Sequence, residues 1–208
     1  MNIATWNVNS LNVRLPQVLN WLANHPHVGV LALQETKTTD DKFPIQAFAE
    51  AGYRVEVFGQ KTYNGVALVS RSDAPGALDV VRNIPGFEDE MARVISATFG
   101  GMRLVGAYFP NGQEPGSDKF AYKMRWLQAL HEWLRAELQR HPKLVLMGDF
   151  NITFDDRDVY DPVALAGTIH CTEEERAHLR SLIDLGLIDA FRQPHLDRGR
   201  RPIDPFCP

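Results

Sequence analysis

The stretch VGVLALQE, residues 28–35, decides which kind of fold this chain can form. From Val28 to Gln34 it is apolar on both faces, which is typical of a strand buried inside a sheet. The strand runs directly into Glu35, so a carboxylate stands where a buried strand ends. Because such a strand needs other elements packed on both of its faces, the stretch predicts a layered α/β or α+β fold.

The residues before this stretch predict a strand followed by a helix. Residues 3–7 alternate with the period of two that marks a strand, and an apolar stripe with helical spacing follows at once. The stripe consists of Leu15, Val18, Leu19 and Leu22. Proline is tolerated in the first turn of a helix, so Pro16 predicts that this helix begins close by.

The middle of the chain predicts successive antiparallel strands. Its apolar runs are rich in β-branched and aromatic residues and are separated by short turns that contain glycine. The runs are Tyr53–Phe58, Gly65–Ser70, Met91–Phe99 and Arg103–Phe109. Strand directions in the fold are therefore expected to be mixed.

Helices dominate the prediction after residue 116. Ser117 can cap a long helix that reaches about Arg140, and residues 143–147 then form another buried strand. Thr172 and Glu175 have the spacing of a capping box at the start of a further helix.

Composition indicates a soluble globular protein. The 208 residues are 44% hydrophobic, and the net charge of 22 − 26 = −4 excludes binding to a polyanion through a general basic coat. Only Cys171 and Cys207 are present, and neither a signal sequence nor an apolar run of about 20 residues occurs. A cytoplasmic protein without a membrane span is expected. No repeat or linker divides residues 1–195, which predicts one domain followed by an Arg- and Pro-rich tail at 196–208.

Acidic and amide side chains recur where the predicted buried strands end. They are Asn7, Asn9, Gln34, Glu35, Asp149 and Asn151. Each one alone fits an ordinary turn or capping residue. Together they offer the oxygen ligands that a hard cation such as Mg²⁺ or Mn²⁺ prefers, so metal-assisted chemistry is the hypothesis.

Several sequence blocks, taken in order, resemble the exonuclease III branch of the endonuclease/exonuclease/phosphatase superfamily. They are TWNVN at residues 5–9, LQETK at 33–37, GQK at 59–61, GVA at 65–67, YFPNG at 108–112 and GDFN at 148–151. The resemblance implies a four-layer α/β sandwich, with two packed mixed β-sheets flanked by helices and the site at one end of the sheets.

The resemblance also implies a role for each site residue. Glu35 would bind Mg²⁺ or Mn²⁺, with Asn7, Asp149 and Asn151 completing or supporting the metal site. Asp149 would deprotonate the attacking water, while Asn151 and Tyr108 would hydrogen-bond the phosphate. A tyrosine keeps its proton at neutral pH and can therefore donate to an oxyanion.

Double-stranded DNA is the partner that the resemblance implies, at 3′ ends or abasic sites, with the protein acting as a monomer in base excision repair. Lys61, Arg93 and Lys119 are the expected DNA contacts. Lys123 and Arg125 lie near the same aromatic residues and are weaker candidates, since a solvated helix face explains them equally well. The implied activity is that of a 3′ to 5′ exodeoxyribonuclease, with abasic-site endonuclease and 3′ phosphatase activity as additions.

The tail departs from the family pattern after His195. The family continues there with an Arg-Ile-Asp strand and a closing Asp-His pair, neither of which is found in residues 196–208. We therefore expect a truncated domain that lacks its final strands. Two alternatives stay open: an inactive remnant that at most binds DNA or metal, and a phosphatase of the same superfamily.

Overall fold

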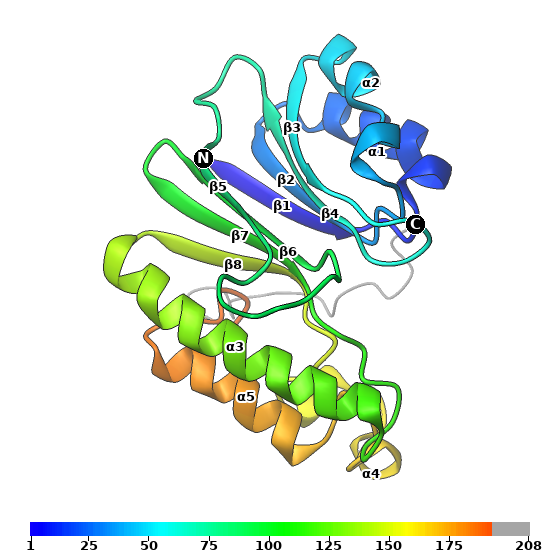
Figure 1. The fold of residues 1–208 in the computed structure, drawn as a ribbon, viewed down its shortest axis with the longest axis vertical. Coiled ribbons are helices and arrows are strands. Elements are labelled where there is room, and N and C mark those ends of the chain that lie inside the picture. The colour runs from blue at the N-terminus through cyan, green and yellow to red at the C-terminus, as the bar shows by residue number, and fades with distance from the viewer. Residues whose placement is uncertain (193–208) are drawn as a thin grey trace.

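The computed structural model describes residues 1–192, which form two sheets with helices outside them (Figure 1). The strands are β1 (Asn2–Asn7), β2 (Val28–Gln34), β3 (Tyr53–Phe58), β4 (Val66–Arg71), β5 (Leu78–Arg82), β6 (Val94–Phe99), β7 (Met102–Tyr108) and β8 (Leu144–Asp149). The α-helices are α1 (Leu11–Asn24), α2 (Ile45–Glu50), α3 (Asp118–Arg140), α4 (Pro162–Leu165) and α5 (Glu173–Asp184), and short 3₁₀ helices lie at Asp40–Lys42 and Asp156–Asp158.

Each sheet contains one parallel pair and two antiparallel pairs. The first sheet has the order β1-β2-β4-β3, with β1 parallel to β2, and the second has the order β5-β6-β7-β8, with β7 parallel to β8. Parallel strands end at the same edge of a sheet. The register pairs Asn7 with Gln34 in the first sheet and Tyr108 with Asp149 in the second. Because β1 of the first sheet contacts β8 of the second, these ends converge.

Three apolar clusters account for the layers. One joins α1 and α2 to the outer face of the first sheet and includes Leu11, Leu33 and Phe48. A second joins α3 and α5 to the outer face of the second sheet and includes Trp126, and a third, which includes Leu68, fills the space between the sheets. The expected four-layer α/β sandwich with two mixed sheets is thereby confirmed.

Several local expectations from the sequence need correction. The predicted strand at Met91–Phe99 begins only at Val94, and β5 was missed because its side chains are mostly exposed and its pairing with β6 is irregular. Pro16 lies in the second turn of α1 rather than the first. The helix tolerates it there because Asn12, whose carbonyl loses its helical partner, lies on the exposed side and can bond water instead.

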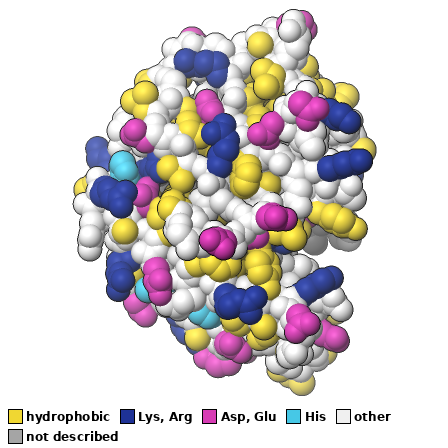
Figure 2. Space-filling view, in the orientation of Figure 1, with side chains coloured by type: hydrophobic (Ala, Val, Ile, Leu, Met, Phe, Trp, Pro, Cys, Tyr) yellow, Lys and Arg dark blue, Asp and Glu magenta, His cyan; other side chains and the backbone are white. Residues whose placement is uncertain are grey.

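The surface carries both signs of charge. Figure 2 shows Lys and Arg interspersed with Asp and Glu on the face that it draws, as the net charge of −4 leads one to expect. Among residues 1–192, every helix is too short or too polar to cross a bilayer. The expected departure from the family pattern, and the boundary at residue 195, lie outside the described residues.

Candidate active site

Asn7 joins the ends of the two sheets through a single side-chain amide. Its Nδ2 donates to Glu35 Oε1 at 2.8 Å, just beyond β2, and to Asp149 Oδ2 at 2.8 Å, at the end of β8. The Asn7 Oδ1 atom accepts from the backbone N–H of Asn9 at 3.0 Å, which fixes the amide orientation. Two carboxylates that belong to different sheets are therefore held together by one neutral group.

Further groups hold the Glu35 carboxylate in its ionised form. Lys37 Nζ lies 2.9 Å from Glu35 Oε2, and the neighbouring Tyr108 hydroxyl also helps to lower the pKa of this carboxylate. Partial burial acts to raise the pKa of Glu35, but the hydrogen bonds from Asn7 and Lys37 and the charge of Lys37 outweigh it, so the pKa lies below its ordinary value. Glu35 is thus charged at neutral pH and able to bind a cation.

The backbone at Glu35 adopts a conformation that residues other than glycine rarely take. Its φ is +52°, in the left-handed region, and Lys37 has φ of +53°. Strain of this kind costs about 1–3 kcal/mol and persists only where surrounding bonds enforce it. Here the Glu35 carbonyl accepts from Ser10 N at 2.8 Å, and Lys37 N donates to the Asn64 carbonyl at 3.0 Å. The turn after β2 is therefore built to aim Glu35 at the end of the sandwich.

Gly148 allows β8 to approach β7 closely enough to place Asp149. Its φ is +144°, and a Cβ built on it would lie 1.8 Å from the Ala107 carbonyl oxygen, which belongs to the neighbouring strand. Only glycine fits this position without moving backbone. The Asp149 carboxylate that follows accepts the backbone N–H of Asn151 at Oδ1, at 3.1 Å, while its Oδ2 accepts from Asn7.

Tyr108 keeps its proton over the whole physiological range. Burial is the main cause that raises its pKa, and the negative charge of Glu35 and the hydrogen bond to it add to the effect, so the pKa reaches about 12. The hydroxyl is therefore a permanent hydrogen-bond donor directed at the carboxylate cluster.

The donor set fits a small hard cation better than a transition metal. Within residues 1–192, no group of three or more His, Cys, Asp and Glu side chains could enclose a metal. Mg²⁺ keeps several waters and is usually held by one or two carboxylates plus substrate phosphates. Glu35 and Asp149 would provide two such carboxylates, whereas Asn7 presents its amide nitrogen to them and so would support the ligands rather than join them.

A pocket of about 430 Å³ opens beside Tyr108. Arg93 and Lys119 line it, and the Arg93 guanidinium lies 5.1 Å from the centre of the Tyr108 ring and 5.8 Å from that of Tyr122. Lys61 is exposed on the loop after β3, next to the pocket residue Gln60. The structure thus brings Arg93 and Lys119 to the site and leaves Lys61 at its margin.

The weaker candidates Lys123 and Arg125 do not face this pocket. The Lys123 side chain is completely buried and bonds protein carbonyls, so it cannot contact DNA. Arg125 lines a separate surface groove between α3 and the loop at residues 85–87. Helical spacing explains the difference, because neighbouring positions on α3 point to different faces.

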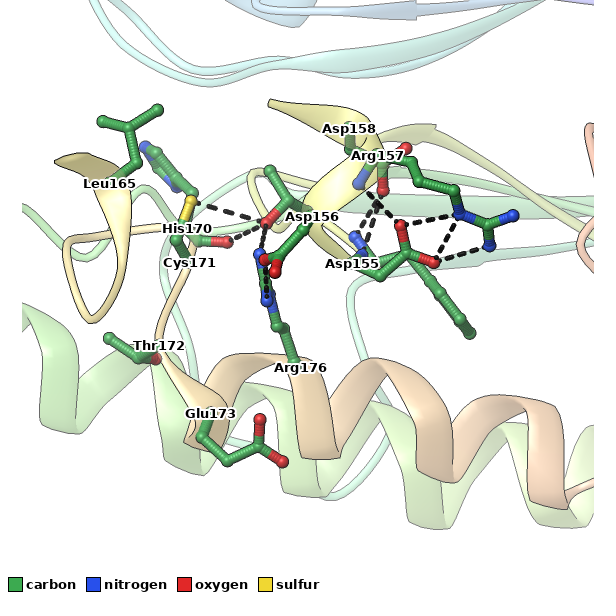
Figure 3. Close-up of polar contacts among 12 residues, drawn as sticks. Asp155, Asp156, Arg157, Asp158, Leu165, His170, Cys171, Thr172, Glu173 and Arg176 are labelled. Carbon is green, nitrogen blue, oxygen red and sulfur yellow. Dashed lines mark hydrogen bonds and ion pairs between the residues drawn. The ribbon is translucent and has the colours of Figure 1, made fainter. Parts of the chain in front are cut away.

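Some side chains near the site make contacts that no sequence pattern predicts. His170 matches no metal-ligand spacing, yet its Nδ1 donates to the Asn151 carbonyl at 2.5 Å. The segment that follows β8 is held to α5 by Arg176, which reaches Asp156 Oδ1 at 2.8 Å and Thr153 Oγ1 at 3.2 Å (Figure 3). These contacts depend on tertiary packing, so a sequence pattern could not have found them.

Known proteins are similar to this chain in both sequence and fold. The Endonuclease/Exonuclease/phosphatase family pattern matches residues 4–203. Exodeoxyribonuclease III of Haemophilus influenzae is 31% identical over 208 residues, covering 93% of this chain and 75% of that protein.

Solved structures agree with this match. The 3′-5′ exonuclease NExo from Neisseria meningitidis is 50% identical with a TM-score of 0.90, and the alignment covers 94% of this chain and 75% of that chain. A 3′ phosphatase NExo variant from Neisseria, bound to a product DNA hairpin, is 49% identical with the same TM-score and coverage. An AP endonuclease from Archaeoglobus fulgidus is 32% identical with a TM-score of 0.87, covering 95% of this chain and 76% of that chain.

Proposed function

Since the chain belongs to the endonuclease/exonuclease/phosphatase family as a relative of exodeoxyribonuclease III, we propose that it is a divalent-metal-dependent nuclease that shortens double-stranded DNA from its 3′ ends. The expected membership of this family of hydrolytic nucleases is confirmed by the matches. The observation that carries the proposal is the single Asn7 amide that bridges Glu35 and Asp149 at 2.8 Å each.

The chemistry of a phosphodiester explains why these groups stand together. When bound, Mg²⁺ would neutralise the charge that develops on the phosphate. Glu35, already ionised, would hold the cation, and Asp149 would take the proton from the attacking water. Tyr108 would donate its proton in a hydrogen bond to a phosphate oxygen, and Asn151 would hold the phosphate or the water without adding negative charge.

DNA is the substrate that the surroundings of the site favour. Arg93 and Lys119 supply positive charge in the pocket beside Tyr108, and the aromatic rings of Tyr63 and Tyr122 line the same pocket. Phosphate contacts of this kind position a nucleic acid strand, and rings can stack an unpaired base. We place the 3′ terminal nucleotide there.

A second activity, removal of a 3′ phosphate, is favoured by one specific observation. A structure that is 49% identical over 94% of this chain is that of a 3′ phosphatase bound to a product DNA hairpin. The same metal, water and donors can hydrolyse a phosphomonoester at a 3′ end as well as a diester. Abasic-site incision is the activity named for the more distant neighbour, at 32% identity.

A panel of DNA substrates tests this proposal. The purified chain, shown to be folded by a cooperative urea transition, is given Mg²⁺ and equal amounts of a 3′-hydroxyl duplex, a 3′-phosphate hairpin and an abasic-site duplex. Shortening of the first and phosphate release from the second are expected. A folded chain that acts on none of the three would contradict the proposal and favour an inactive remnant. If such a chain turns over a free phosphomonoester, supplied in a separate reaction, a phosphatase is favoured instead.

A further inference from the structure

A buried ion pair lies directly behind the loop that carries Asp149 and Asn151. Lys123 of α3 and Glu175 of α5 are 2.5 Å apart, and both side chains are completely buried. Burial lowers the pKa of Lys123, and the hydrogen bond and charge of Glu175 oppose that shift. Because removing two charges from water is costly, apolar residues of similar size would often stabilise the fold as well or better. The pair therefore needs an explanation other than stability.

Lys123 uses its remaining protons to hold two loops of the site. Its Nζ donates to the Asn151 carbonyl at 2.7 Å and to the Asn111 carbonyl at 3.1 Å. The first loop follows β8 and the second follows β7, the strands that end in Asp149 and Tyr108. With Glu175 as the third partner, every proton of the ammonium group is directed at an acceptor.

Glu175 also holds the segment that contains His170, the second residue that contacts the Asn151 carbonyl. Its Oε1 accepts the backbone N–H of His170 at 3.1 Å, and its Oε2 accepts from Thr172 Oγ1 at 2.7 Å in the capping box of α5. The His170 ring in turn donates from Nδ1 to the Asn151 carbonyl at 2.5 Å. The Asn151 carbonyl is thus held by Lys123 and His170, and both of these residues also donate a hydrogen bond to Glu175.

The contacts continue through the backbone into the catalytic carboxylate. Asn151 has a φ of +47°, and its N–H donates to Asp149 Oδ1 at 3.1 Å. The Asn151 carbonyl is therefore held by Lys123 of α3 and by His170 just before α5, while the Asn151 N–H, in the preceding peptide unit, aims the Asp149 carboxylate. One continuous chain of bonds leads from Glu175 through Lys123, Asn151, Asp149 and Asn7 to Glu35.

We propose that Lys123 and Glu175 are positioning residues of the nuclease site, which set the orientation of the Asp149 carboxylate through the backbone of Asn151. The inference rests on the proposed function for its kinetic consequence. Since a displacement of about 1 Å can cost about a hundredfold in rate, a buried pair that secures this loop acts on catalysis without touching substrate.

The chain provides a matched control for this proposal. Arg103 and Glu137 form a second ion pair at 2.7 Å, with side chains only 2% and 4% exposed. Glu137 lies on α3, as Lys123 does, while Arg103 lies near the start of β7, at the end of that strand opposite to Tyr108. Both pairs join α3 to its surroundings, but only one touches the site.

The experiment compares two double variants that remove each pair without leaving a buried charge. Lys123→Met with Glu175→Gln keeps an acceptor for the capping box, and Arg103→Met with Glu137→Gln is its counterpart.

The readouts are the urea midpoint, the NMR resonance of the Asn151 amide, and kcat and KM for phosphate release from a 3′-phosphate hairpin. We expect the first variant to shift the Asn151 resonance and to lose about tenfold to a hundredfold in kcat with KM little changed. The control should lose comparable stability and keep both kcat and the resonance.

Two results would overturn the inference. One is equal kcat for the two variants, and the other is an Asn151 resonance that does not move in the first. If the first variant does not fold, Glu175→Gln alone must still move that resonance. Because the resonance is measured without DNA, it tests the positioning role even if wild-type chain hydrolyses nothing, which would contradict the proposed function instead.

Discussion

Replacement of Asp149 by asparagine is expected to slow hydrolysis of a 3′-terminal phosphodiester by about 10²- to 10⁴-fold, the usual contribution of a positioned general base. Asparagine keeps the shape of the side chain and an oxygen that can accept from Asn151 N, but it cannot take a proton from water. The Asn7 amide would also face a second amide in place of a carboxylate oxygen. The measurement is kcat on a 5′-labelled duplex at saturating Mg²⁺.

A nearby exposed carboxylate provides the control for this change. Asp156 lies on the same segment after β8 and pairs with Arg176 at 2.8 Å, away from the Glu35 cluster. Asp156→Asn should leave kcat within about twofold of wild type, as surface substitutions usually have small effects. If Asp149→Asn lowers kcat by less than about tenfold, Asp149 has a structural role and does not take part in the proton transfer.

Glu35→Ala is expected to raise the Mg²⁺ concentration needed for half-maximal rate by about a hundredfold or more. Groups that merely support a metal ligand are worth about 10- to 100-fold in affinity, and a direct ligand carries at least as much. The rate at saturating metal should fall too, because the same carboxylate accepts from the Asn7 amide and so aligns it with Asp149. A Mg²⁺ titration of the initial rate measures both effects.

The control for Glu35 is a glutamate without a place in the site. Glu50 ends α2 and is exposed, so Glu50→Ala should leave the Mg²⁺ titration unchanged. If Glu35→Ala has the same half-maximal Mg²⁺ concentration as wild type, Glu35 does not hold the cation.

The pH dependence follows from the pKa directions. A carboxylate with a depressed folded pKa stabilises the fold above its unfolded pKa and loses that contribution as pH falls through the folded value. For Glu35 this loss lies below its ordinary value of 4.5. For Tyr108 the pKa of about 12 places proton loss far above neutrality, so the neutral hydroxyl favours folding below its ordinary value of 10.0 and this contribution disappears toward pH 12.

That polar side chains gather at one end of the sheets could be predicted, because strand ends can be read from a pattern. Period and apolar runs located β1, β2, β7 and β8, and the polar residues at their ends were therefore candidates for one site. What the pattern could not supply was the packing of β1 of the first sheet beside β8 of the second, which brings the Asn7 amide within 2.8 Å of Asp149 although 142 positions separate them. The recurrence of family motifs filled that gap.

Errors arose where tertiary packing decides the role of a residue. Lys123 belongs to a helix with charged neighbours and looks solvated in the sequence, yet its ammonium group is buried against Glu175, more than 50 positions away. Gln34 appeared among the polar strand ends but is buried and bonds Thr5 within the first sheet. Helical and strand periods assign a face to each side chain, but they do not tell which neighbours cover that face.

Metal dependence of 3′-end hydrolysis tests the central claim most directly, that the Asn7-bridged carboxylates form a cation-dependent nuclease site. The purified 208-residue chain is incubated with a 5′-labelled blunt duplex and Mg²⁺, then with excess chelator, then with Mg²⁺ restored. The structure predicts a ladder of products shortened from the 3′ end that stops growing in chelator and resumes afterwards. Shortening that continues at the same rate in excess chelator would contradict the claim. So would the absence of any shortening with Mg²⁺ when the chain is shown to be folded by a cooperative unfolding transition.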